Sequence, residues 1–80
     1  MEKIKLIWDF RGGDAQKMAE HHEKHLKEFM KSRNEFAIEI TGVESINDVY
    51  TIAFLVITND NMPAVRDILR PHRGELYEEA

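Results

Sequence analysis

Residues 49 to 57, VYTIAFLVI, form a run that is apolar on both sides of an extended chain. Successive side chains of a strand point to opposite faces, so a strand of this composition has to be covered on both faces. The run therefore predicts a strand at the centre of a sheet, with the rest of the chain supplying the layers around it.

Two further segments have the alternation of strands. In KIKLIWDF, residues 3 to 10, apolar and charged side chains alternate, which is typical of a half-buried strand. FAIEI, residues 36 to 40, alternates in the same way. Gly42 and the pair Asn47 and Asp48 are turn formers, and they predict the return of the chain to the central strand.

Two helices are predicted between these strands. The first begins at Asp14 as N-cap and runs to about Arg33, because apolar residues recur at spacings of three and four. The second is shorter, with Pro63 in its first turn and Pro71 after its end. The residues expected to face the sheet are Ala15, Met18, Ala19, Leu26, Phe29 and Met30 from the first helix, and Met62, Val65, Ile68 and Leu69 from the second.

The order of these elements predicts a single α+β domain over residues 1 to 80. Short, right-handed connections favour a ferredoxin-like β-α-β-β-α arrangement, an antiparallel sheet with the third strand central and two helices on one face. The tail GELYEEA is expected to form either a short strand or an irregular return. Only the segment GELYE, residues 74 to 78, could supply a fourth strand next to the first strand. Without it that edge is open, although Lys3 and Lys5 discourage uncontrolled pairing.

The face of the sheet away from the helices is predicted to be apolar. If Trp8, Ile38 and Phe54 point towards the helices, the opposite face carries Ile7, Ala37, Ala53, Leu55 and Ile57. Such a face is too apolar for water, which predicts a homodimer formed through it. The alternative is a monomer with a partly apolar open sheet.

Composition excludes several classes of function. The chain has no cysteine, so disulfides and thiolate metal sites are excluded and any metal has to be held by His, Asp or Glu. A net charge of -4 argues against general affinity for nucleic acid. No apolar run approaches the roughly 20 residues of a membrane span, and the first ten residues do not suit a signal peptide. We expect a soluble, cytoplasmic protein that binds neither nucleic acid nor membrane.

The ending WDFR of the first strand, and the segment IAFLVITNDNMPAVRDIL that leads from the central strand into the second helix, resemble the small dimeric α/β-barrel proteins. That resemblance implies a ferredoxin-like fold and a dimer. Members of the group include small monooxygenases, isomerases and stress-induced proteins, so the resemblance implies no particular chemistry.

A ligand site is predicted at one rim of the sheet. The first strand ends there, the first helix begins there, and the second helix ends there. The residues gathered at this rim would be Asp9, Arg11, His22, Arg70, His72 and Arg73. Arginine matches carboxylate or phosphate, and histidine exchanges a proton near neutral pH, so the set suits a small polar or anionic ligand. If the protein is an enzyme, cofactor-free acid–base chemistry fits these groups. The alternative is that Asp9 pairs with an arginine and the set only ties down chain ends.

The segment HHEKH offers a second kind of site. His21 and His25 have the i, i+4 spacing that chelates one metal ion, and Glu28 is a candidate oxygen ligand on the same flank. His72 is the alternative third ligand. A divalent metal is the cofactor that this alternative requires. The competing interpretation is a solvated helix flank. His22 lies within the apolar stripe and should have a polar partner there. A third hypothesis is an interaction protein without a ligand site.

Overall fold

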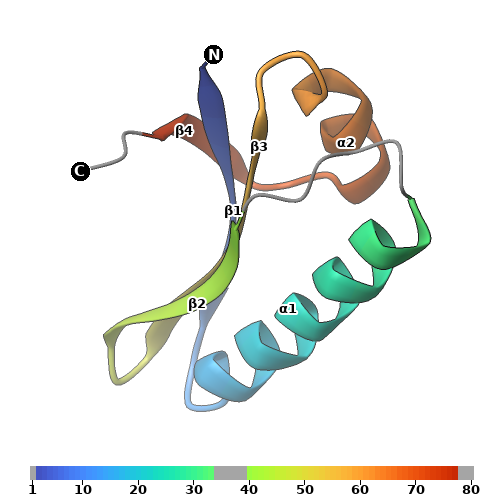
Figure 1. Cartoon of the computed structure of the whole chain (residues 1–80). Helices are drawn as coiled ribbons and strands as arrows, with labels where there is room; N and C mark the ends of the chain where they lie inside the picture. Colours follow the sequence, from blue (N-terminus) through green and yellow to red (C-terminus); the bar gives the residue numbers. More distant parts are fainter. Residues whose placement is uncertain (1, 34–39, 78–80) are drawn as a thin grey trace.

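The computed structural model describes residues 2–33 and 40–77. The elements are β1 (Lys3–Arg11), α1 (Ala15–Ser32), β2 (Ile40–Asn47), β3 (Tyr50–Thr58), α2 (Met62–Leu69) and β4 (Arg73–Tyr77). The strands form one antiparallel sheet in the order β2-β3-β1-β4, and both helices lie on the same side of it (Figure 1). The α+β class and the place of β3 between β1 and β2 agree with the sequence-based prediction.

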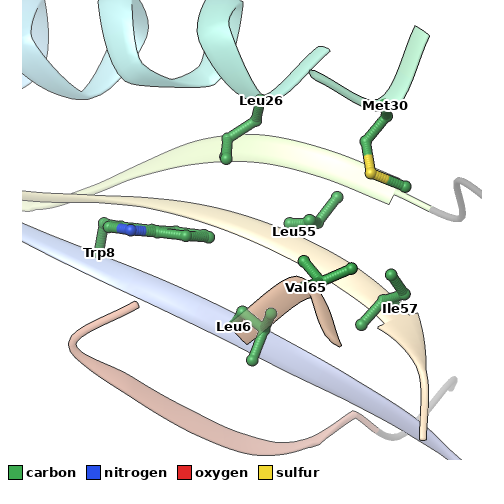
Figure 2. Packing of buried hydrophobic residues seen from close by; sticks show 7 residues of the cluster. All are labelled: Leu6, Trp8, Leu26, Met30, Leu55, Ile57 and Val65. Carbon is green, nitrogen blue, oxygen red and sulfur yellow. The ribbon is translucent and has the colours of Figure 1, made fainter. Parts of the chain in front are cut away.

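The core lies between this sheet and the two helices. It contains Leu6 and Trp8 of β1, Leu55 and Ile57 of β3, Leu26 and Met30 of α1, and Val65 of α2 (Figure 2). Each of these side chains is at most 3% exposed. Burying an apolar side chain of this size stabilises the fold by about 1.5–3 kcal/mol, so this layer is the main source of stability.

The face of β3 that packs against the helices differs from the expectation. Leu55 lies opposite Leu6 and Ile57 lies opposite Ile4, while Phe54 is paired with Ile7 on the other face. Directly opposed residues share a face. The odd-numbered and the even-numbered residues of this run are both apolar, so its composition does not determine which set faces the helices. The pairing with β1 determines it.

This register corrects the predicted dimer surface. Ala53, Leu55 and Ile57 lie on the helix-covered face, so they are not available to a second copy. Ile7 does lie on the open face, but it is only 1% exposed within the single chain. Ala37 lies outside the described residues.

The position of β2 also differs from the predicted strand at residues 36 to 40, of which only Ile40 is described. Gly42, predicted as a turn residue, lies inside β2 opposite Phe54. A Cβ atom on Gly42 would lie 2.5 Å from Cζ of Phe54, so the glycine makes room for the ring. The turn comes later, where Asn47 Oδ1 accepts a hydrogen bond of 2.9 Å from the Val49 N–H.

The helices lie close to where the sequence predicts them, but their ends differ in detail. Asp14 occupies the N-cap of α1 without a side-chain capping bond, and the Ala15 N–H donates instead to the carbonyl of Gly12. Gly12 has a φ of +112°, which only glycine adopts easily. Met18, expected to be buried, is 42% exposed, and Ile68 of α2 is 46% exposed.

Of the two expectations for the tail GELYEEA, the short strand is confirmed, and it adds a fourth strand after α2 to the predicted β-α-β-β-α order. Arg73–Tyr77 form β4, which pairs with β1. The pairing begins where the His72 N–H donates to the carbonyl of Ile7, 3.0 Å away. Backbone hydrogen bonds hold this polar segment, so periodicity gave little sign of it. As a result, β1 is an interior strand.

Candidate functional site

A hydrogen-bonded network joins three strands on the open face of the sheet. Arg73 Nε and Nη2 donate to the two carboxylate oxygens of Asp9 at 3.2 Å each, and Nη2 also donates to the Tyr50 hydroxyl at 3.2 Å. The Tyr50 hydroxyl donates a short hydrogen bond to Asp9. Hydrogen bonds from Arg73 and Tyr50 hold the pKa of Asp9 below its ordinary value, and the Asp9 partner raises the pKa of Arg73. The carboxylate of Asp9 is thereby fixed as an ionised structural partner.

His72 is attached to the same residue from a different direction. Its Nδ1 accepts a hydrogen bond of 2.8 Å from the backbone N–H of Asp9, and it lies 3.9 Å from the Asp9 carboxylate. An accepting Nδ1 carries no proton, so the neutral ring holds its proton on Nε2. Nε2 is then the atom of His72 that can donate to a ligand.

His22 packs into the helix-covered side of the sheet. Its ring lies 4.8 Å from the ring of Trp8 and 5.6 Å from that of Phe10. Its Nε2 is buried and has no hydrogen-bond partner among the described residues, contrary to the expectation of a polar partner. Burial lowers the pKa of His22, with smaller contributions from His25, His72 and His21. The ring therefore favours the neutral form.

A cavity of about 450 Å³ lies between α2, β1 and β4. Its floor is apolar. A Cβ on Gly74 of β4 would lie 3.5 Å from Leu6 and 3.6 Å from Ile4, so a larger residue would occupy part of the cavity that the glycine leaves empty. The lining residues are Ile4, Leu6, Met62, Arg66, Pro71, His72, Arg73, Gly74, Glu75 and Leu76. Leu76 is 54% exposed, so this apolar surface is open to solvent.

Two polar side chains of the cavity are suited to an anion. Arg66 of α2 is exposed, and its Nε lies 3.4 Å from the carboxylate of the neighbouring Asp67. An exposed pair of this kind contributes little free energy, so an incoming anion can compete for the guanidinium. His72 contributes its ring. The guanidinium of Arg73, in contrast, is bonded to Asp9 on the open face of the sheet.

The structure brings together part of the predicted rim site. Asp9 contacts both His72 and Arg73, whereas His22 packs against Trp8 and Phe10 on the helix-covered side of the sheet. Arg11 joins this group through Tyr50, because its guanidinium lies 4.0 Å from the centre of the Tyr50 ring. Arg70 occupies the left-handed C-cap position of α2, where its backbone N–H donates to Arg66. The rim residues thus divide between the two faces of the sheet.

Sequence reasoning missed Tyr50, Arg66 and Gly74. Tyr50 pairs with Arg11 and so lies on the open face with Asp9, which the doubly apolar run of residues 49 to 57 did not indicate. The signal that could have identified Arg66 is the helical periodicity of α2, because Arg66 follows the apolar Met62 by four residues and so lies beside it. Gly74 gave no sign of its role, because that role depends on the pairing of β4 with β1.

His21 and His25 lie on successive turns of α1 with their Nε2 atoms 3.0 Å apart. Glu28 lies 3.9 Å from Nδ1 of His25. Within residues 2–33 and 40–77, no group of three or more His, Cys, Asp or Glu side chains has the geometry of a metal site. The predicted three-ligand set of His21, His25 and Glu28 is therefore not assembled in the structure.

No protein-family model, curated protein or solved structure matches this chain. Within the described part of the chain, no helix has the length and apolar character needed to cross a membrane.

Proposed function

We propose that the protein binds a small molecule with an apolar body and one anionic group in the cavity between α2 and β4. The observation that carries this proposal is the combination of an apolar floor with Arg66 and His72 in a single cavity of about 450 Å³. Small-molecule sites are commonly about 300–1,000 Å³, mostly apolar, with a few polar groups that fix orientation.

The chemistry of the lining narrows the ligand class. Ile4, Leu6 and Leu76 suit an aliphatic or aromatic body. Arg66 suits a carboxylate or phosphate, because its planar guanidinium forms paired hydrogen bonds with such groups. His72 adds a donor through Nε2. A carboxylate on a short hydrocarbon body satisfies these groups together.

The test is a titration of the full chain followed by amide chemical shifts in NMR spectra. The probes are benzoate and octanoate, with benzyl alcohol and octanol as uncharged counterparts. We expect shifts in α2 and β4, and tighter binding of each carboxylate than of its alcohol. Arg66→Gln should weaken carboxylate binding about tenfold, corresponding to roughly 1.4 kcal/mol, and bring it near that of the alcohol.

Two further variants make this test specific. Gly74→Val should block all four probes while keeping the fold, because its Cβ meets Leu6 and Ile4 at ordinary contact distances. Arg11→Gln removes a matched arginine on the open face and should leave binding unchanged. Loss of binding in Arg11→Gln with retention in Arg66→Gln would refute the cavity and favour the rim first predicted from the sequence.

We also propose that the fold is ferredoxin-like and that the chain is related to the small dimeric α/β-barrel proteins. The sheet order β2-β3-β1-β4 supports this, as does the placement of both helices on one face. The homodimer and the cytoplasmic location stay predictions. Self-association in solution is the property that tests the relation most directly.

A further inference from the structure

The histidine pair of α1 has a geometry that the small-molecule site does not use. The rings of His21 and His25 meet edge to face, with centroids 4.5 Å apart. Their Nε2 atoms approach to 3.0 Å. Both residues are exposed, and the side chain of His25 is 59% exposed. Two imidazole nitrogens thus converge at one accessible point.

We propose that Nε2 of His21 and Nε2 of His25 together chelate one late first-row transition ion, with Cu²⁺ bound most tightly, and Ni²⁺ and Zn²⁺ more weakly. At metal–nitrogen distances of about 2.0–2.1 Å, two nitrogens in square-planar or tetrahedral coordination lie about 2.8–3.4 Å apart. The separation of 3.0 Å falls within this range, so the rings need little movement. It is also the length of a hydrogen bond in which one Nε2–H donates to the other Nε2, so the ion replaces this proton, which moves to Nδ1 of the same ring or to solvent.

Glu28 has a different role from the one expected from the sequence. Its carboxylate lies near Nδ1 of His25, the nitrogen opposite the one that would bind the ion. It therefore cannot reach the ion as a ligand without moving away from this position. At 3.9 Å it makes no hydrogen bond with Nδ1, but its negative charge favours a proton on that nitrogen, which leaves Nε2 for the metal. Carboxylates commonly orient metal-binding histidines in this way.

The preference among ions follows from the ligand set. Mg²⁺ and Ca²⁺ favour oxygen ligands, whereas imidazole suits copper, nickel and zinc. With two protein ligands the remaining positions are filled by water, so binding is weaker than at a structural zinc site. Copper should bind most tightly, because affinities of nitrogen sites follow the order that peaks at Cu²⁺.

The experiment is calorimetric titration of the full chain with CuCl₂, together with electron paramagnetic resonance of the copper complex. We expect one ion per chain and hyperfine coupling to two imidazole nitrogens. His21→Ala and His25→Ala should each weaken binding at least tenfold and reduce the coupling to one nitrogen. Both side chains are exposed, so the fold should be kept, and circular dichroism checks this.

Two other variants separate this site from general copper affinity. His72→Ala removes a different exposed histidine and should leave copper binding unchanged. Glu28→Gln should weaken binding about threefold to fivefold while both nitrogens remain coupled, as expected for a positioning residue. Unchanged affinity in the His21→Ala, His25→Ala double variant would overturn the proposal. Copper binding is independent of the α2–β4 cavity, so this outcome would leave the small-molecule proposal standing.

Discussion

Arg73 donates two hydrogen bonds to the carboxylate of Asp9, each 3.2 Å long, and thereby ties the start of β4 to the interior of β1. Two donated bonds give this pair a fixed geometry, which is stronger than a single exposed ion pair. The side chain of Asp9 is 19% exposed, while that of Arg73 is 47% exposed, so solvent still weakens the interaction. The contact is therefore a moderate but specific stabiliser of the sheet.

Asp9→Asn should lower the free energy of unfolding by about 1 kcal/mol at neutral pH, because the amide lacks the negative charge to which Arg73 and Tyr50 donate hydrogen bonds. The folded pKa of Asp9 lies below its ordinary value of 3.8, so its contribution is present above pH 3.8 and disappears as the pH falls through the folded pKa. Urea unfolding of both proteins across this range measures the difference. Asp67→Asn, an exposed carboxylate outside the network, is the control. A difference between wild type and Asp9→Asn that stays constant on acidification would contradict the role assigned to Asp9.

His22→Leu should raise the free energy of unfolding by about 1–2 kcal/mol, because it removes a buried nitrogen that has no hydrogen-bond partner among the described residues. Leucine also favours helix by about 0.5 kcal/mol, and His21→Leu on the exposed side measures that effect alone. Chemical denaturation of the three proteins gives the comparison. Equal stability of the two variants would mean that Nε2 of His22 is satisfied in solution.

Gly42→Ala should destabilise the sheet by about 1 kcal/mol or more, because the new methyl group meets the Phe54 ring at 2.5 Å. The displaced ring would also leave Lys5, whose Nζ lies 4.5 Å above its centroid. Gly13→Ala is the matched control, since nothing lies within 4 Å of a Cβ there. Thermal unfolding should show a drop for Gly42→Ala only. Similar melting of both variants would show that the ring turns aside at no cost.

Sedimentation at micromolar concentration should show a species of twice the 9.4 kDa chain mass, if the open face of the sheet pairs with a second copy. Ile40 lies on that face opposite Val56 and is 37% exposed. Ile40→Lys should therefore shift the equilibrium towards the single chain. Glu44→Lys, further along the same strand face, tests whether added charge alone has this effect. A 9.4 kDa species throughout would end the dimer prediction.

The sequence predicts much of the fold because periodicity is a local property. The alternation in β1 and the three-and-four spacing in α1 identify both elements almost to the residue. β3 was recognised as a central strand, but its register was not, since both of its faces are apolar and only the pairing with β1 separates them. The prediction assigned the wrong face to each side chain of β3, so Leu55 lies in the core and not on the predicted dimer surface.

The candidate site was less predictable, because it depends on pairings between distant segments. The topology brings Asp9 and His72 together, as the rim hypothesis requires. The hydrogen bond from the Asp9 backbone N–H to Nδ1 of His72 could not be predicted from either segment alone. Gly42 is the opposite case, where a residue typical of turns serves instead to admit an aromatic ring. Such a role becomes visible only once Phe54 is placed beside it.

Four residues of β4, from Arg73 to Leu76, form one wall of the cavity, and Arg73 also attaches this strand to Asp9. Any guest molecule adds contacts to the attached state of the strand and none to its detached state, so occupancy and attachment rise together. Amide hydrogen exchange at residues 73 to 77 would then slow in step with saturation. The exchange rates of the β4 amides would then report the fraction of the protein whose cavity is occupied.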